Sequence, residues 1–224
     1  MKTFLLAGTQ SGVGKSSIAF GLMAALRLRQ LQVQAFKVGP DFRDPLLYEV
    51  VTGRPCFNLD SWLLDQAANE ATLHRQARQS DVGVIDGVMG LFDGLDGTND
   101  SGSTAQMAKW LGVPVVLVID CWAMGRSVAA LVRGFQTFDE DVKISGLILN
   151  KVGSKAHAQW LLSALQSAGC AIPILGSLPK ESGIGVPEQL LGELLEPRVT
   201  ATPACDMCMT LCTTPVLVDA GGGG

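Results

Sequence analysis

Six short runs of apolar residues recur between residues 3 and 176 of the chain. Most of these runs are almost continuously apolar rather than alternating, which is typical of parallel strands that are buried on both faces. They predict strands at residues 3–7, 33–38, 82–86, 113–120, 144–150 and 172–176.

Helical periodicity appears between these runs. Apolar residues at helical spacing predict a helix from residue 16 to about residue 30, with its stripe at Ile18, Leu22, Ala25 and Leu26. Further helices are predicted at residues 61–79, 104–111, 125–138 and 154–168. Because strands and helices alternate, the sequence predicts an α/β fold with a doubly wound, mostly parallel sheet. Ligands of such sheets bind beyond the carboxyl ends of the strands, so the loops after the strands are the candidate sites.

The composition is that of a globular chain. Of the 224 residues, 47% are hydrophobic and 17% are charged, which suffices for a sizeable core. The net charge of −4 argues against nonspecific binding to nucleic acid. No apolar run approaches the roughly 18 residues of a membrane span, and the N-terminus shows no signal-peptide pattern. We therefore expect a cytoplasmic protein that binds neither nucleic acid nor a membrane.

The character of the sequence changes near residue 197. We expect one domain over residues 1–196 and a tail over residues 197–224, which reads as the truncated start of a further domain. Cys205, Cys208 and Cys212 in this tail have a spacing that a metal site can use, but no fourth ligand lies nearby in the sequence. The sequence assigns these cysteines no role.

The loop after the first predicted strand reads AGTQSGVGKSS, and it resembles a phosphate-binding loop in which the first glycine, Gly8, stands one position early. Gly8, Gly12 and Gly14 would let backbone N–H groups turn toward phosphate oxygens, and the next helix would point its positive end there. Lys15 would bind the β- and γ-phosphates, and the Ser16 hydroxyl could ligate Mg²⁺. The alternative is a glycine-rich turn with a solvated lysine.

Carboxylates follow two other predicted strands. Asp41 and Asp44 lie in the loop FKVGPDFRDP, with Lys37 just inside the strand end. Such a pair suits Mg²⁺ binding or the positioning of a substrate, although aspartate is also common in ordinary turns. Asp86 ends the buried strand of VIDGVMGLFDG, and Asp93 follows it. A carboxylate at this place is typical of the Walker-B ligand of Mg²⁺.

Two further loops carry polar residues. Ser103 begins a predicted helix in GSTAQMAKWL, where free N–H groups and hydroxyls could hold an anion such as a substrate carboxylate. Ser103 could equally be a simple helix cap. Asn150 lies at the strand end of LILNKVGS, and its amide could read a purine edge or cap a helix.

These strings occur in the order seen in one enzyme family. GTQSGVGKSS, FKVGPDFRDP, NLDSWLL, VIDGVMGLFDG, LILNKVGSKAH and GSLPKE resemble the cobyrinic acid a,c-diamide synthase family, in a superfamily that includes dethiobiotin synthetase. The resemblance spans roughly residues 1 to 192 and implies a P-loop NTPase fold of the dethiobiotin synthetase-like type. It implies a ligase that uses ATP and Mg²⁺ to phosphorylate the a and c carboxylates of a corrin-type macrocycle in cobalamin biosynthesis. Ammonia would then displace phosphate to give the amide.

The resemblance also assigns roles to individual residues. The nucleotide-binding set is Gly8, Thr9, Gly12, Val13, Gly14, Lys15, Ser16, Ser17 and Asn150, with Asn150 at the adenine. The metal-binding set is Ser16, Asp41 and Asp86, and the catalytic set is Lys15, Asp41, Asp44, Asp86 and Asp93. The substrate-binding set is Lys37, Phe42, Arg43 and Ser103.

Three departures from the family pattern change these expectations. Asp86 stands where the family commonly has glutamate, so a shorter side chain must reach the metal. Phe42 and Arg43 stand where the family often has an aromatic–aliphatic pair, and Arg43 could change which macrocycle or carboxylate the enzyme accepts. The family's ammonia normally comes from glutamine through a C-terminal amidotransferase domain, which does not follow here. We therefore expect a separate amidotransferase domain or subunit, or free ammonia, and a homodimer stays open.

Three other functions remain as alternatives. They are a dethiobiotin synthetase-like ligase, a P-loop switch ATPase and a nonfunctional truncated copy. The switch ATPases carry a second lysine where this loop has Gln10, which argues against that class.

Overall fold

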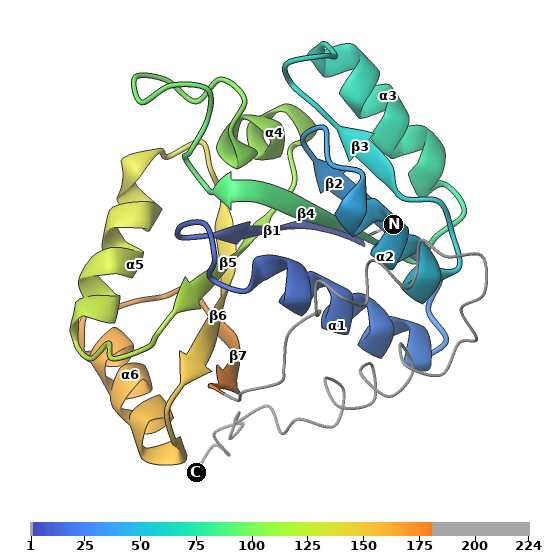
Figure 1. The fold of residues 1–224 in the computed structure, drawn as a ribbon. Helices are drawn as coiled ribbons and strands as arrows, with labels where there is room; N and C mark the ends of the chain where they lie inside the picture. Colours follow the sequence, from blue (N-terminus) through green and yellow to red (C-terminus); the bar gives the residue numbers. More distant parts are fainter. Residues whose placement is uncertain (1, 181–224) are drawn as a thin grey trace.

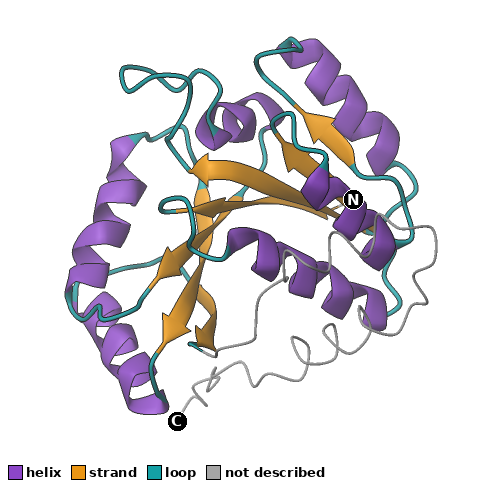
Figure 2. Cartoon of the chain, in the orientation of Figure 1, coloured by secondary structure: helices purple, strands orange, loops and turns teal. Residues whose placement is uncertain are grey.

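The structure, a computed structural model, describes residues 2–180. Seven parallel strands form one sheet in the order β3-β2-β4-β1-β5-β6-β7 (Figures 1 and 2). The strands are β1 (Lys2–Gly8), β2 (Val33–Val38), β3 (Phe57–Leu59), β4 (Val82–Gly90), β5 (Val115–Asp120), β6 (Ile144–Val152) and β7 (Ile174–Pro179). The helices are α1 (Lys15–Leu28), α2 (Arg43–Thr52), α3 (Gln66–Ala77), α4 (Thr104–Leu111), α5 (Ser127–Phe138) and α6 (Lys155–Ser167). The predicted α/β fold is confirmed.

Helices cover both faces of the sheet (Figure 1). Successive residues of a strand point to opposite faces, so the fully buried Leu5 and Leu6 of β1 belong to two different cores. Leu5 packs in the core that includes residues of α3, α4, α5 and α6, and Leu6 packs with residues of α1 and α2. Each such burial contributes roughly 1.5–3 kcal/mol. The continuous apolar runs of the sequence reflect this burial on both faces.

The sequence did not predict two elements near the site, helix α2 and strand β3. Helix α2 carries Pro45 in its first turn, and the Asp-Pro pair there reads as a loop in the sequence. Proline is tolerated in this position because the first turn of a helix has no intrahelical partner for its N–H groups. Strand β3 has only three residues, with Asn58 in the middle, and so gives no apolar run. Helix α2 follows β2 directly in the chain, and β3 pairs with β2 as the edge strand of the sheet.

The limits of α3 and β4 also differ from prediction. Helix α3 begins at Gln66 rather than at residue 61 because Asp65 caps it, with its side chain accepting the N–H of Ala68. Before it, Asp60 accepts two N–H groups of a turn. Strand β4 continues past its predicted end at Asp86 to Gly90. Asp86 therefore lies within a strand that is held on both sides.

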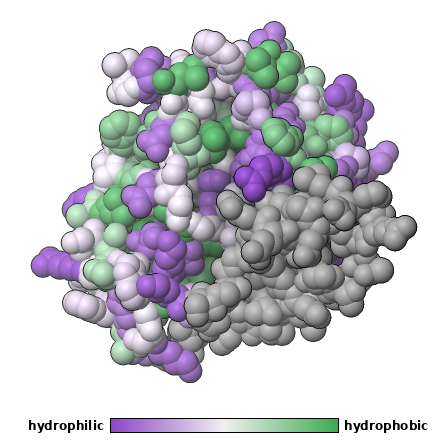
Figure 3. Space-filling model, viewed as in Figure 1, coloured by the Kyte–Doolittle hydropathy of each residue, from purple (hydrophilic) through white to green (hydrophobic). Residues whose placement is uncertain are grey.

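Within residues 2–180, no helix is long and apolar enough to cross a membrane. On the face shown in Figure 3, polar and apolar side chains are interspersed over the part that the structure describes. The predicted domain boundary between residues 196 and 197 and the cysteines of the tail, Cys205, Cys208 and Cys212, lie outside the described residues.

The strand order brings three predicted loops together. Because the strands are parallel, their carboxyl ends share one edge of the sheet. Strand β4 lies between β1 and β2, and Asp86 is the register partner of Leu6 in β1 and of Lys37 in β2. The loops that follow β1, β2 and β4 therefore meet around Asp86.

Candidate active site

The loop from β1 to α1 has the backbone of an anion-binding turn. Gly12 and Gly14 have φ angles of 78° and 91°, in the left-handed region that favours glycine. Gly14 is the N-cap residue of α1, so the positive end of the helix faces this loop. Lys15 is the first residue of α1, and Ser16 follows it.

Steric contacts explain why position 8, one residue before the usual glycine position, is a glycine. A Cβ on Gly8 would lie 2.7 Å from Val13 Cγ2 and 2.9 Å from the carbonyl oxygen of Gln10. Val13 is buried at 1% exposure in the core under α1 and α2, so it cannot move aside freely. The loop therefore folds back onto Gly8 itself. Thr9, at the usual glycine position, donates its N–H to the carbonyl of Val118 in β5 at 3.1 Å.

Asp86 is fully buried and lies at the centre of a cluster of charged and polar groups. Lys15 Nζ is 3.0 Å from Oδ1 of Asp86, and Lys37 Nζ is 2.7 Å from Oδ2. The hydroxyls of Tyr48 and Ser16 also donate to Oδ2, at 2.7 and 3.2 Å. The cluster thus joins the phosphate loop, β2, α2 and β4.

Asp44, in the first turn of α2, is the second carboxylate of this cluster. Its Oδ2 accepts hydrogen bonds from Ser16 Oγ at 3.0 Å and from Lys37 Nζ at 2.8 Å. Asp41 lies further out, with its Oδ2 at 3.8 Å from Lys37 Nζ. Its Oδ1 accepts the backbone N–H groups of Arg43 and Asp44 where α2 begins. Of the two carboxylates that follow β2, Asp44 is therefore the one that contacts Ser16, and the predicted role of Asp41 as a ligand stays a prediction.

The charges in the cluster stabilise one another. Burial alone would raise the pKa of Asp86, but Lys15 and Lys37 with their positive charges hold that pKa below its ordinary value. Burial also opposes the charge of Lys37, and Asp86 and Asp44 overcome it, so the pKa of Lys37 is raised. Burial and the same two carboxylates raise the pKa of Tyr48 well above its ordinary value. Near neutral pH, Asp86 and Lys37 are therefore charged and Tyr48 keeps its proton.

Ser16, Asp44 and Asp86 bring together oxygens of the kind that Mg²⁺ prefers, and the ammonium of Lys37 lies within 2.8 Å of both carboxylates. Ser16 Oγ lies 3.0 Å from Asp44 Oδ2 and 3.2 Å from Asp86 Oδ2. Mg²⁺ binds oxygen at about 2.0–2.1 Å in octahedral geometry, so neighbouring ligand oxygens are about 3 Å apart. No group of three His, Cys, Asp or Glu residues suited to a metal occurs within residues 2–180. Mg²⁺ is usually held by one or two carboxylates together with substrate phosphates, so this finding does not bear on it.

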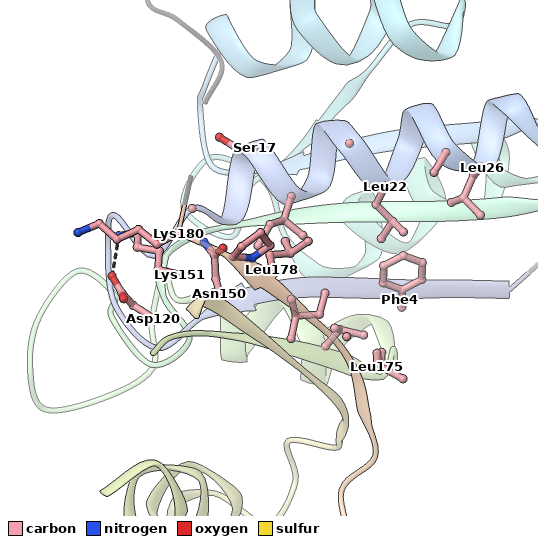
Figure 4. Close-up of a pocket in the computed structure, with 18 of the residues that line it drawn as sticks. Phe4, Ser17, Leu22, Leu26, Asp120, Asn150, Lys151, Leu175, Leu178 and Lys180 are labelled. Atoms are coloured by element: carbon pink, nitrogen blue, oxygen red, sulfur yellow. Dashed lines mark hydrogen bonds and ion pairs between the residues drawn. The ribbon is translucent and has the colours of Figure 1, made fainter. Parts of the chain in front are cut away.

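A pocket of about 860 Å³ adjoins the phosphate loop and runs between α1 and the face of the sheet formed by β1, β5, β6 and β7 (Figure 4). Gly14, Ser17 and Asn150 line its polar end. Phe4, Leu22, Leu26 and Leu175 line its apolar part. The polar end lies beside the phosphate-binding loop and is the candidate place for a nucleoside, whereas the apolar part extends along α1 as far as Arg29.

Asn150 and Lys151 connect this pocket to the phosphate loop. The Asn150 side-chain amide donates to the carbonyl of Val13 at 2.7 Å. Lys151 Nζ forms an ion pair with Asp120 at 2.6 Å and donates to the carbonyl of Gly12 at 3.2 Å (Figure 4). The predicted contact of Asn150 with adenine stays a prediction.

The remaining predicted residues lie in different surroundings. Ser103 is fully buried, and its hydroxyl caps α4 by accepting the N–H of Gln106 at 3.1 Å, as the alternative interpretation held. Asp93 accepts the N–H of Gly90 at 3.0 Å in the turn after β4. Phe42 is 77% exposed and Arg43 is also exposed at the start of α2, so both are open to a ligand. The substrate roles of these residues stay predictions.

Sequence reasoning missed Tyr48. The signal that could have found it is its spacing of four residues from Asp44, which places both side chains on one face if the segment is helical. The sequence predicts no helix between residues 38 and 61, so the spacing of four residues did not place Asp44 and Tyr48 on one face.

Residues 4–188 match the CobQ/CobB/MinD/ParA nucleotide binding domain family. The chain belongs to this family. This confirms nucleotide binding as the role of the domain. The predicted relationship to cobyrinic acid a,c-diamide synthases is confirmed as well, because curated proteins of that name are similar to the chain over most of its length.

Three of these relatives illustrate the similarity. The cobyrinate a,c-diamide synthases of Syntrophotalea carbinolica and of a Synechococcus strain are each 45% identical to this nucleotide-binding domain over 188 residues. That of Gloeobacter violaceus is 46% identical over the same length. Each alignment covers 84% of the chain and 41% of the relative. The chain thus spans less than half the length of these curated relatives.

Solved structures show the same fold at low sequence identity. Chloroplast FtsY from Physcomitrella patens superposes with a TM-score of 0.56 at 18% identity, over 87% of this chain and 65% of that one. FtsY from Elizabethkingia anophelis in complex with GDP gives a TM-score of 0.54 at 13% identity, over 96% and 64%. These similarities establish the fold alone, and they agree with the predicted doubly wound, mostly parallel sheet.

Proposed function

We propose that the chain is the synthetase domain of an ATP-dependent amidating ligase that acts on the a and c carboxylates of a corrin-type macrocycle in cobalamin biosynthesis. The relatives that carry the name cobyrinate a,c-diamide synthase support the substrate class. The observation that supports the proposed chemistry is the buried cluster around Asp86. In this cluster Lys15 of the phosphate loop and Lys37 near the end of β2 both pair with the Asp86 carboxylate.

The proposed reaction has two displacements. A carboxylate oxygen of the macrocycle attacks the γ-phosphorus of ATP, the bond to the β,γ-bridging oxygen breaks, and ADP leaves. Ammonia then attacks the carbonyl carbon of the acyl phosphate, phosphate leaves, and the nitrogen loses a proton. Such phosphoryl transfer depends mainly on positioning and on neutralising the oxygens of the phosphate.

The residues of the chain supply these two requirements. The loop N–H groups and Lys15 bind the phosphates, and Asn150 with the adjoining pocket holds the base. Ser16 and Asp86, together with Asp44 or Asp41, would hold Mg²⁺, which neutralises charge on the phosphates when it is bound. Lys37 would orient the incoming carboxylate, since its ammonium lies between Asp44 and Asp86 at the end of β2.

An ADP-release assay tests the proposal. The purified chain is supplied with ATP, Mg²⁺ and ammonium, and with cobyrinate, hydrogenobyrinate, Ni-sirohydrochlorin or diaminopelargonate plus carbonate in separate reactions. We expect ADP release with a corrin-type substrate, an amide product by mass spectrometry, and a hydroxamate when hydroxylamine replaces ammonium. Turnover with diaminopelargonate alone would assign the chain to dethiobiotin-type chemistry instead.

We also propose that the ammonia comes from a glutamine amidotransferase on a separate domain or subunit. The support is the family resemblance, in which ammonia normally comes from glutamine through an amidotransferase domain. The assay above compares glutamine with ammonium as the nitrogen source. Turnover with ammonium and none with glutamine is expected for the chain alone, and equal turnover with both would contradict this part of the proposal. Localisation in the cytoplasm and a homodimer remain predictions.

A further inference from the structure

Tyr48 is the only tyrosine in the sequence and is almost completely buried, at 1% exposure. It lies in α2, and its hydroxyl donates to Oδ2 of Asp86 in β4 at 2.7 Å. A buried hydroxyl needs a hydrogen-bond partner, and most find one in a nearby backbone carbonyl. This hydroxyl instead binds the carboxylate at the centre of the candidate active site.

We propose that Tyr48 is a positioning residue that fixes the orientation of the Asp86 carboxylate for Mg²⁺–nucleotide binding and couples it to α2. The inference rests on the proposed function in one respect, because it assumes that Asp86 binds Mg²⁺ together with a nucleotide. It goes beyond that function because Tyr48 is neither a proposed metal ligand nor a proposed nucleotide-binding residue.

The first argument concerns charge. Of the groups that donate to Oδ2 of Asp86, Lys37 is a cation, whereas Tyr48 and Ser16 are neutral hydroxyls. A divalent cation at this carboxylate repels an ammonium group and leaves a neutral hydroxyl in place. Ser16 is itself a proposed metal ligand. Tyr48 is therefore the donor that can keep its bond to Asp86 when the metal arrives.

The second argument concerns rigidity. Lysine side chains have four rotatable bonds, whereas a tyrosine ring is placed by two. The Tyr48 ring is packed in the core between α1, α2 and the sheet, with Phe20 and Leu47 in the same cluster. Its hydroxyl is thus held at a fixed place relative to β4. Groups that support a metal ligand in this way typically change metal affinity or activity by 10–100-fold when they are removed.

The third argument concerns α2. Asp44 and Tyr48 lie four residues apart on this helix, and they contact Ser16 and Asp86 respectively. A shift of α2 would therefore move the Asp44 carboxylate and the Tyr48 hydroxyl together relative to Asp86. The same helix begins with Arg43 and follows Phe42, the exposed residues of the predicted substrate loop. Through Tyr48, the position of this loop is linked to the position of Asp86.

Tyr48→Phe tests the proposal because phenylalanine fills the same volume and lacks only the hydroxyl. The affinity of a fluorescent ADP analogue is measured over a range of Mg²⁺ concentrations. We expect the Mg²⁺ concentration for half-saturation to rise about tenfold or more, with nucleotide affinity in EDTA unchanged within about twofold. An unchanged Mg²⁺ dependence in a folded Tyr48→Phe protein would overturn the proposal.

Thr52→Val is the matched control. Thr52 is also a buried hydroxyl of α2, at 1% exposure, and it donates to the carbonyls of Tyr48 and Arg54. Its side chain makes no contact with Asp86 among the hydrogen bonds of the described residues. We expect its Mg²⁺ dependence to match the wild type even where its melting temperature falls. If Thr52→Val and Tyr48→Phe raise the Mg²⁺ requirement equally, the effect comes from α2 stability, and the proposed role is wrong.

The single tyrosine also gives a direct signal without turnover. Wild-type protein labelled with 3-fluorotyrosine should show one ¹⁹F resonance, which we expect to shift with ADP plus Mg²⁺ and to stay in place with ADP plus EDTA. An unmoved resonance in a protein that binds Mg²⁺–ADP would contradict the proposal. Absence of any Mg²⁺-dependent nucleotide binding in the wild type would instead contradict the proposed function.

Discussion

Lys15 and Asp86 are 71 positions apart in the sequence, and their side chains form a buried ion pair at 3.0 Å. Lys15 also donates to the carbonyl of Gly87, the residue after Asp86. The phosphate loop is therefore tied to the strand that carries the candidate metal ligand. Since the lysine is expected on the β- and γ-phosphates when nucleotide is bound, binding must exchange this ion pair for phosphate contacts.

Lys15→Ala should abolish most substrate-dependent ADP release. One charge pair at about 4 Å is worth roughly 4 kcal/mol at an effective dielectric constant of about 20. At about 1.4 kcal/mol per tenfold, the rate should fall by about 10²–10³. Lys109→Ala is the control, because Lys109 pairs with Asp100 and Asp139 at the surface of α4 and has no part in the site. Comparable rates for Lys15→Ala and Lys109→Ala would contradict the assignment.

Asp86→Asn should abolish ADP release and lower stability. The change leaves Lys15 and Lys37 in a largely buried site without their shared counter-charge, which typically costs about 3–5 kcal/mol. Denaturant unfolding measures the stability, and the ADP assay measures the activity. Asp96→Asn serves as the control because Asp96 is an exposed loop carboxylate. An Asp86→Asn protein with wild-type ADP release would exclude the proposed role.

Gly8→Ala should weaken nucleotide binding by more than about tenfold, because a Cβ at this position meets Val13 and the carbonyl of Gln10. The loop must open to accept it, which displaces the N–H groups that face the phosphates. Gly97→Ala is the matched control, since a Cβ there has no neighbour within 4 Å. Titration with a fluorescent nucleotide compares the two. Equal affinities would show that the early glycine is not required.

Acid should destabilise the wild type more than Asp86→Asn. The pKa of Asp86 lies below its ordinary value of 3.8 in the folded protein, so the unfolded chain binds its proton more readily. The contribution of Asp86 to stability is therefore complete above the ordinary value and is lost as the pH falls through the lowered one. Unfolding free energies measured from about pH 6 to about pH 3 should fall more steeply for the wild type. Parallel curves would show that Asp86 is not held ionised by its partners.

Local patterns predicted much of the fold and part of the site. The glycine spacing of the phosphate loop and the position of Asp86 at the end of an apolar run are short-range signals, and the structure brings both together. Helix α4 was predicted with its observed limits because Ser103 gives a clear cap signal. The hydroxyl of Ser103 serves as this cap, and its predicted substrate role stays a prediction.

Long-range contacts were beyond sequence reasoning. Whether Asp41 or Asp44 contacts Ser16 depends on the first turn of α2. The sequence did not predict this turn to be helical, because an Asp-Pro pair is typical of a loop. The contact of Tyr48 with Asp86 joins residues 38 positions apart and has no local pattern. Such contacts follow from the strand order, which the sequence did not specify.

The register of β4 has a consequence for how this domain tolerates change. Asp86 is aligned with Lys37 on one side and with Leu6 on the other by the sheet ladder, not by the loops. Residues inserted in the exposed loop at residues 96–99 would leave this alignment intact, so that loop can vary in length. Directly after Gly90 the chain is less tolerant, because Leu91 is fully buried and donates its N–H to the carbonyl of Gly8. One residue inserted in β4 before Asp86 would instead turn the carboxylate to the opposite face of the sheet. Changes in the exposed loop therefore leave the pairing of Asp86 with Lys37 and Leu6 unaltered, whereas changes within β4 do not.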